Sequence, residues 1–141
     1  MDYEIRYLGG IILFNEGDYF EAHEVWESLW LDYAGPDRSF YQGLIQAAVG
    51  LLHFANGNLR GAKKLYTTSK MYMEQYGVKH LGLDLTLFWN QMTTCFADII
   101  SDTETKPGTI LNDDWLPSIT LDPEPKHWPT REEYWVEEDE P

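Results

Sequence analysis

Apolar residues recur at helical spacing through the first hundred residues, and this pattern predicts five helices separated by turns that contain glycine, asparagine or proline. The clearest signal lies at Gly17–Trp30, where Asp18 and Glu21 have the spacing of a capping box ahead of a helical apolar period. The expected helices cover residues 2–15, residue 18 to a stop at Gly35-Pro36, and residues 37–55, 59–76 and 84–101.

The apolar faces of these helices predict which side chains form the core. The third helix is apolar on most sides, which is typical of the most buried element of a domain. Phe20 or Tyr19 is expected on the inner face of the second helix, and Leu87 on that of the fifth. The pair Gly9–Gly10 weakens the first helix by ~1 kcal/mol per glycine. Its lack of side chains would instead let a neighbouring helix come close.

The helical period ends at Ser101, and six of the seven prolines lie at or beyond Pro107. Such a segment cannot form a long helix. Its apolar residues are nevertheless costly to leave in water. We therefore divide the chain into a helical domain, residues 1–101, and an acidic arm rich in proline and tryptophan, residues 102–141. Residues 107–136 are expected to pack in an extended form on the helical body, or on a second subunit, through Trp115, Leu116, Ile119, Leu121, Trp128, Tyr134 and Trp135.

A short internal repeat relates the second and fourth helices. The segment from Phe14 to Gly17, with Ala22 five residues later, is echoed forty residues on by Phe54 to Gly57 and Ala62. Glycine closes the turn and alanine permits a close crossing, as in tetratricopeptide-like helical hairpins. The pattern predicts an all-α protein, a compact five-helix bundle of such hairpins with an extended C-terminal arm.

The charge and the cysteine content limit the classes of function. The formal net charge is −14, and residues 101–141 contribute 12 acidic and 3 basic residues to it. This argues against a nucleic acid or an anionic membrane as partner, because both require clustered Lys and Arg. No segment approaches the ~18 apolar residues of a membrane span, so the expected location is the cytoplasm. The single cysteine, Cys95, lies in an apolar segment and is expected to be a buried, unreactive thiol.

Two of the predicted helices carry polar residues in register. His23 and Glu27 lie one turn apart on the second helix. On the third, which is otherwise apolar, Gln42, Gln46 and His53 fall on one stripe. Buried polar groups need partners. We therefore expect the two sets to face each other across a helix–helix contact, as a polar seam.

Two interpretations of this seam remain open. One is a hydrogen-bond network that fixes the register of the two helices. The other is a pocket for a small ligand or for a divalent metal, zinc or iron, with His23, Glu27 and His53 as ligands. The segment beginning at His23 is not a zincin motif, because Glu27 stands where the second histidine would be.

The chain resembles the small all-helical proteins catalogued as domain of unknown function 309. The residues that carry the resemblance are FNEGDYFEAHEVWESLW at Phe14–Trp30, RSFYQGLIQAAVGLLHF at Arg38–Phe54 and GNLRGAKKL at Gly57–Leu65. It covers about residues 10–76. It implies a helical bundle with tetratricopeptide-like hairpins and no established activity. It also implies that the block containing His23, Glu24 and Glu27 and the block containing Gln42 and Gln46 form the signature of the family.

These observations favour a non-enzymatic helical protein. It would act through contacts with a partner protein or a second copy of itself, or through a small ligand bound at the seam. The alternative is a metal-dependent enzyme, most plausibly a hydrolase, that activates a metal-bound water at His23, Glu27 and His53, with Glu24 as a candidate base.

Overall fold

A computed structural model describes residues 2–101 and 108–135 of the chain, and it confirms the prediction of an all-α protein. The helices of the body are α1 (Ile5–Asn15), α2 (Tyr19–Asp32), α3 (Arg38–Ala55), α4 (Leu59–Glu74) and α5 (Leu85–Ile100). The smaller elements are β1 (Lys79–His80), β2 (Leu83–Asp84), the 3-10 helix η1 (Asp113–Trp115) and α6 (Arg131–Tyr134).

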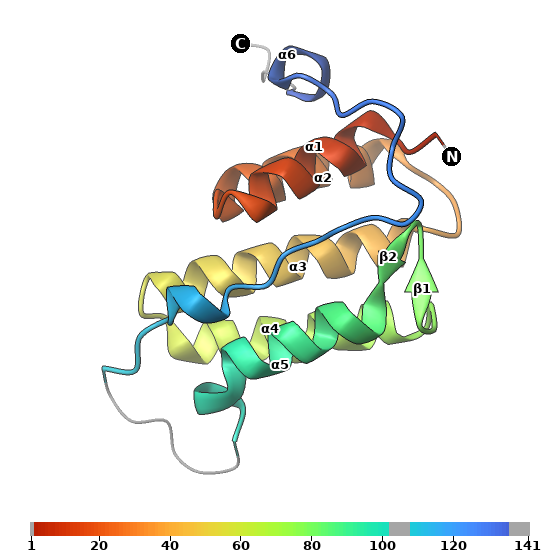
Figure 1. The fold of residues 1–141 in the computed structure, drawn as a ribbon. Helices are drawn as coiled ribbons and strands as arrows, with labels where there is room; N and C mark the ends of the chain where they lie inside the picture. The colour runs from red at the N-terminus through yellow and green to blue at the C-terminus, as the bar shows by residue number, and fades with distance from the viewer. Residues whose placement is uncertain (1, 102–107, 136–141) are drawn as a thin grey trace.

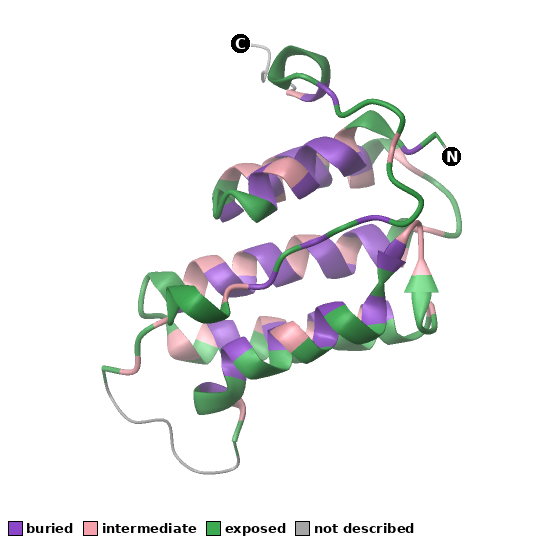
Figure 2. Ribbon diagram, in the orientation of Figure 1, coloured by how far each residue is buried: buried purple, intermediate pink, exposed green. Residues whose placement is uncertain are grey.

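The helices pack in sequence order, with α3 at the centre. Helix α1 packs on α2, and α3 lies between α2 and α4 (Figure 1). Helix α5 lies beside α4, and the two short strands form an antiparallel hairpin that pairs Lys79 with Asp84. No position of α3 from Phe40 to Phe54 is exposed (Figure 2), so this helix has the central place that its composition predicts.

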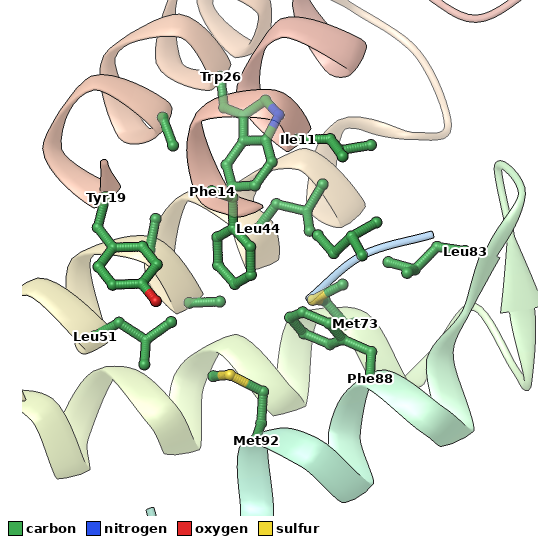
Figure 3. Close-up of a cluster of buried hydrophobic side chains, with 14 of the residues drawn as sticks. Ile11, Phe14, Tyr19, Trp26, Leu44, Leu51, Met73, Leu83, Phe88 and Met92 are labelled. Carbon is green, nitrogen blue, oxygen red and sulfur yellow. The ribbon is translucent and has the colours of Figure 1, made fainter. Parts of the chain in front are cut away.

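The core is a single cluster to which every long helix contributes. Trp26, Phe14 and Leu44 are almost wholly buried, and side chains from α4, α5 and β2 point toward them (Figure 3). Each fully buried side chain of this size contributes about 1.5–3 kcal/mol relative to an exposed one. The periodic apolar residues of the sequence therefore account for the packing of the bundle.

The double glycine of α1 is a point of close approach on two sides. A Cβ on Gly10 would overlap the indole ring of Trp26, and one on Gly9 would overlap the ring of Tyr134. The Trp26 indole N–H donates to the carbonyl of Tyr7 at 3.1 Å. The expectation that these glycines admit a neighbour is confirmed, and the neighbours come from both α2 and α6.

The two turns of the internal repeat have the same geometry. Gly17 and Gly57 have φ values of 82° and 80°, in the left-handed region that favours glycine. The amide that follows each glycine donates to a carbonyl five residues earlier, at 2.9 Å from Asp18 and 2.8 Å from Asn58. Whether the hairpins are tetratricopeptide-like stays a prediction.

Two local predictions were wrong, and of the two alternatives for the inner face of α2, Tyr19 rather than Phe20 is correct. Tyr19 is buried but Phe20 is 55% exposed, and Leu87 is 49% exposed because Leu85, Phe88 and Met92 occupy the inner side of α5. The Asp18 side chain makes no capping hydrogen bond. Its expected partner Glu21 binds an arginine of the arm instead.

Residues 108–135 run along the helical body, and part of this arm is buried against it (Figure 2). The side-chain amide of Asn15 makes two hydrogen bonds with the backbone of Ile119. Its nitrogen donates to the Ile119 carbonyl at 2.8 Å, and its oxygen accepts from the Ile119 N–H at 2.8 Å. Leu121 pairs with Leu83 of the hairpin. Of the aromatic residues expected as anchors, Tyr134 is buried, whereas Trp115 and Trp128 are exposed.

In the part of the chain that the structure describes, no helix has both the length and the apolar character needed to cross a membrane.

Candidate functional site

The outer side of α2 carries a stripe that mixes apolar and acidic residues. Tyr19, Ala22, Val25, Trp26 and Leu29 fill the inner arc of the helix. Because residues turn by ~100° along a helix, the positions opposite this arc recur every three or four residues. They are Phe20, Glu24, Glu27 and Leu31, which we call the α2 stripe. Its two ends are apolar and exposed, Phe20 at 55% and Leu31 at 64%.

A half-open groove of about 380 Å³ follows this stripe. Its lining consists of Phe20, His23, Glu24, Val25, Glu27, Ser28 and Leu31 from α2 and Trp135 from the end of the arm. The volume falls within the ~300–1,000 Å³ range of ligand sites. The groove is therefore large enough to hold several side chains of a partner or a small organic molecule.

His23 and Glu27 come together on the edge of this groove. The His23 Nε2 lies 3.0 Å from a Glu27 carboxylate oxygen, and its Nδ1 lies 3.1 Å from the Phe20 carbonyl. Both ring nitrogens thus face oxygen acceptors, and the imidazole can donate to both only in its doubly protonated form. The Glu27 side chain is 48% exposed, so this pair lies at the surface.

The wall of the groove formed by Trp135 depends on how α6 is held. The Arg131 guanidinium donates to both carboxylate oxygens of Glu21, at 3.1 and 3.2 Å, and lies 4.3 Å from the centre of the Trp135 ring. At the start of α6, the Thr130 N–H and His127 bind the Glu133 carboxylate, and these hydrogen bonds lower the pKa of Glu133. Gly9 of α1 supplies the space for Tyr134.

The lining of the groove is acidic. Arg131 forms an ion pair with Glu21, whereas Glu24 and Glu27 lie along the groove. Among the described residues that line it, none is a lysine or an arginine. Protonated His23 would offset one of these two charges. The groove therefore combines apolar ends with a middle that favours cations.

The structure does not bring the predicted seam together. Gln46 accepts a hydrogen bond of 2.5 Å from Thr68 of α4. The side-chain amide nitrogen of Asn58, in the turn before α4, lies 3.3 Å from Nδ1 of His53. These contacts place that stripe of α3, including half-buried Gln42, on the side of α4 rather than α2. The bulky inner residues of α2 fill its contact with α3, which leaves His23 and Glu27 on the outside.

The metal ligands predicted from sequence are likewise not assembled. Among the described residues, no group of three or more His, Cys, Asp or Glu side chains is placed to hold a metal ion. His23 and Glu27 form a pair without His53, which lies in the last turn of α3. Glu24, the candidate base, lies along the same groove as the pair.

A further histidine–carboxylate pair, at His80, was not expected from the sequence, in which His80 lies in a loop. The His80 Nε2 lies 2.7 Å from Asp37, which also accepts a hydrogen bond of 3.0 Å from the Tyr33 hydroxyl. The His80 ring packs against the rings of Phe40 and Tyr76, which also pack against each other. These contacts fix the β-hairpin to the turn between α2 and α3, and a separation of 43 residues leaves no local sequence signal for them.

Sequence reasoning did not select Phe20, Leu31 and Trp135 for the site. Phe20 and Leu31 lie eleven residues apart, three helical turns, on the stripe of Glu24 and Glu27. That spacing was the available signal. Trp135 could not have been added, because its position depends on the packing of the arm.

Taken together, the fold and the groove define a small helical-bundle protein with a groove on its surface. The model of the family described as "Domain of unknown function (DUF309)" matches residues 7–65. This match confirms the resemblance over α1, α2, α3 and the first half of α4, and it includes every groove residue except Trp135.

A curated relative matches a similar length of the chain. The uncharacterised protein YpuF of Bacillus subtilis (strain 168) is 40% identical over 70 residues. The match covers 48% of this chain and 40% of YpuF, so the chain spans less than half of the length of that relative. Neither comparison attaches an activity to the groove.

Proposed function

We propose that the chain is a protein-binding module whose α2 groove receives a basic, amphipathic segment of a partner protein. The observation that carries the proposal is the α2 stripe itself, in which exposed Phe20 and Leu31 flank the carboxylates of Glu24 and Glu27. A helix that lays its apolar side chains in a groove is a recurring mode of peptide recognition.

The apolar ends of the groove would supply most of the affinity. Phe20 and Leu31 leave apolar surface in water in the unbound protein, and Trp135 gives the groove an aromatic wall. Aromatic residues are enriched among the side chains that dominate binding energy at protein interfaces. A partner with apolar residues three turns apart would cover both ends at once.

The charge of the groove would select the partner. Glu24 and Glu27 have no lysine or arginine beside them in the lining, so lysine or arginine side chains of a partner would complete the pairing. Charge complementarity of this kind contributes mainly to specificity and to the rate of association. It also distinguishes a basic partner from an acidic one of equal apolar content.

We further propose that the protein acts in the cytoplasm. Cys95 is a buried free thiol. Reducing compartments maintain cysteines in this form.

The test is a fluorescence-anisotropy titration with a labelled synthetic helix of leucine, lysine and alanine, as long as α2, with leucines on one face. The double substitution Phe20→Ala/Leu31→Ala should weaken binding about tenfold or more, because both apolar ends are lost. Glu24→Gln/Glu27→Gln should weaken binding at low ionic strength and have a smaller effect at high ionic strength.

The matched control is Val78→Ala/Ile110→Ala, which removes two apolar side chains that are 74% and 82% exposed elsewhere on the chain. This variant should bind like the parent. Equal loss of affinity in the groove variant and the control would mean that the peptide adheres without a site. Unchanged affinity in both groove variants would overturn the proposal.

A further inference from the structure

The outer side of α4 is a basic stripe on an acidic protein. Arg60, Lys63, Lys64, Thr67, Lys70, Met71 and Glu74 recur every three or four residues, and all seven are exposed. The opposite side, which includes Ala62, Ser69 and Met73, is buried against α3 and the core. From Arg60 to Met73 the helix contains no acidic residue. We call residues Arg60–Met71 on this outer side the α4 stripe.

Most other bases that the structure describes have a partner, whereas the bases of this stripe have no ion pair or ring contact. Arg6 binds Asp32, Arg38 lies over the Trp30 ring, Lys79 binds Asp122 and Arg131 binds Glu21. Within residues 2–101 and 108–135, five basic residues have neither an ion pair nor a ring contact. One is Lys126, and the other four lie in the α4 stripe: Arg60, Lys63, Lys64 and Lys70.

The position of these charges is unfavourable for the helix that carries them. Helix α4 begins at Leu59, so Arg60, Lys63 and Lys64 lie in its first two turns, and its first turn has no acidic residue. The helix dipole favours acidic side chains at that end. Arg60 is also three and four residues from Lys63 and Lys64, spacings at which like charges repel. Local rules broken without compensation inside the fold are expected at functional sites.

We propose that the α4 stripe is a second docking surface, and that it binds an acidic segment of another protein. The carboxylates of such a segment would pair with the bases of the stretch from Arg60 to Met73, in which α4 has no acidic residue of its own. Met71, which is 58% exposed, would give the segment an apolar contact, and methionine adapts to partners of different shape.

An acidic peptide fits this stripe better than a nucleic acid. The four basic residues extend over about 15 Å of helix. Tyr66, which lies between Lys64 and Lys70 in the sequence, is buried, so the outer side of the helix offers no aromatic ring on which a nucleobase could stack. The remainder of the chain brings the formal net charge to −14, which would repel a long polyanion extending past the stripe. A short acidic segment would feel mainly the local cations, since charges farther than about 8–10 Å are screened.

This surface is separate from the α2 groove, because α3 lies between α2 and α4 (Figure 1). One molecule could therefore hold a basic segment on α2 and an acidic segment on α4 at the same time. The inference adds a second partner to the proposed function and makes the protein an adaptor.

The test is an anisotropy titration with a labelled synthetic helix of glutamate, leucine and alanine, with the parent protein and two charge-matched variants. Lys63→Glu/Lys64→Glu changes the stripe, and Lys79→Glu/Lys126→Glu makes the same change of net charge at exposed lysines elsewhere. We expect about a tenfold or greater loss of affinity for the first variant and little change for the second.

The melting temperature separates binding from folding in this test. The stripe variant should melt at or above the temperature of the parent, because carboxylates near the start of α4 suit the helix dipole. Equal weakening by both variants, or no binding at low ionic strength, would overturn the inference. So would a single-stranded oligonucleotide that binds the stripe more tightly than the acidic helix does. Loss of acidic-peptide binding with intact basic-peptide binding would separate this surface from the α2 groove.

Discussion

At the scale of single residues, Gly9 affects the packing of a second element as well as that of its own helix. It lies on α1, yet the side chain it admits is Tyr134, whose neighbour Trp135 forms a wall of the groove. Gly50 on α3 is a useful contrast. A Cβ there would lie 3.5 Å from the nearest atom, Cβ of Leu65, which is an ordinary contact.

We predict that Gly9→Ala destabilises the protein by about 1–3 kcal/mol, because the new Cβ overlaps the Tyr134 ring. It should also weaken binding of the basic peptide, since α6 must shift. Gly50→Ala should be neutral or stabilising by up to about 1 kcal/mol, because alanine favours helix. Urea unfolding measures both substitutions. Equal stability of the two variants would contradict this role for Gly9.

Cys95 is a second residue whose surroundings determine its chemistry. Burial raises the pKa of its thiol from an ordinary 9.0 to about 12. Burial likewise raises the pKa of the neighbouring Tyr19 hydroxyl. The thiol should therefore resist alkylation in the folded protein at pH 8 and react readily in urea, because only the thiolate is nucleophilic.

The same shift predicts how stability depends on pH. A thiol with a raised pKa keeps its proton in the folded state while the unfolded state loses it, so the stabilisation is complete below pH 9 and is lost between about pH 9 and pH 12. Urea unfolding at pH 8 and pH 10.5 should show a decrease at the higher pH that is smaller in Cys95→Ala. A free energy of unfolding that is constant over this interval would contradict the burial of these groups.

At the scale of elements, helix positions could be predicted well and helix orientations only in part. The apolar period and the glycine turns determine where α2 and α3 begin and end, because they are local properties of the chain. Which residue of α2 faces α3 depends on the summed bulk of Tyr19, Val25 and Trp26, which outweighs the tendency to pair polar stripes. For this reason the polar stripes of α2 and α3 do not face each other in the way that the sequence predicted.

The pair of His23 and Glu27 provides a test at this scale. In a buried network, loss of His23 would leave polar groups unpaired, at about 1–3 kcal/mol. As a surface pair on the α2 stripe it should contribute about 0–1 kcal/mol. We therefore predict that His23→Ala lowers the melting temperature only slightly, and by no more than the conservative substitution His23→Gln does. Scanning calorimetry measures the melting temperatures of both variants. A large loss of stability would mean that His23 faces the interior.

The arm shows what sequence reasoning can say about a segment without periodicity. Its apolar content correctly indicated burial at Ile119, Leu121 and Tyr134. It could not identify the partners, because the contact of Ile119 with Asn15 spans 104 residues and follows no local rule. The same limit applies to Trp135 in the groove and to the pairing of His80 with Asp37.

At the scale of the whole molecule, the charges are arranged in two opposing surfaces. Acidic residues lie along the α2 groove, unpaired bases lie along α4, and α3 separates the two. The formal net charge of −14 does not reflect this separation of acidic and basic surfaces. The net charge of the whole chain disfavours long polyanionic partners, whereas short segments respond to each surface separately.

The proposed function depends on the binding of a basic amphipathic segment in the α2 groove. The most direct measurement is a two-dimensional nitrogen–proton NMR titration of labelled protein with the leucine–lysine–alanine helix. We predict that the largest shifts fall on Phe20, Glu24, Glu27 and Leu31 and on the Trp135 indole N–H, with the Arg60–Met71 amides unchanged. Shifts concentrated away from α2, or no shifts at saturating peptide, would contradict the account.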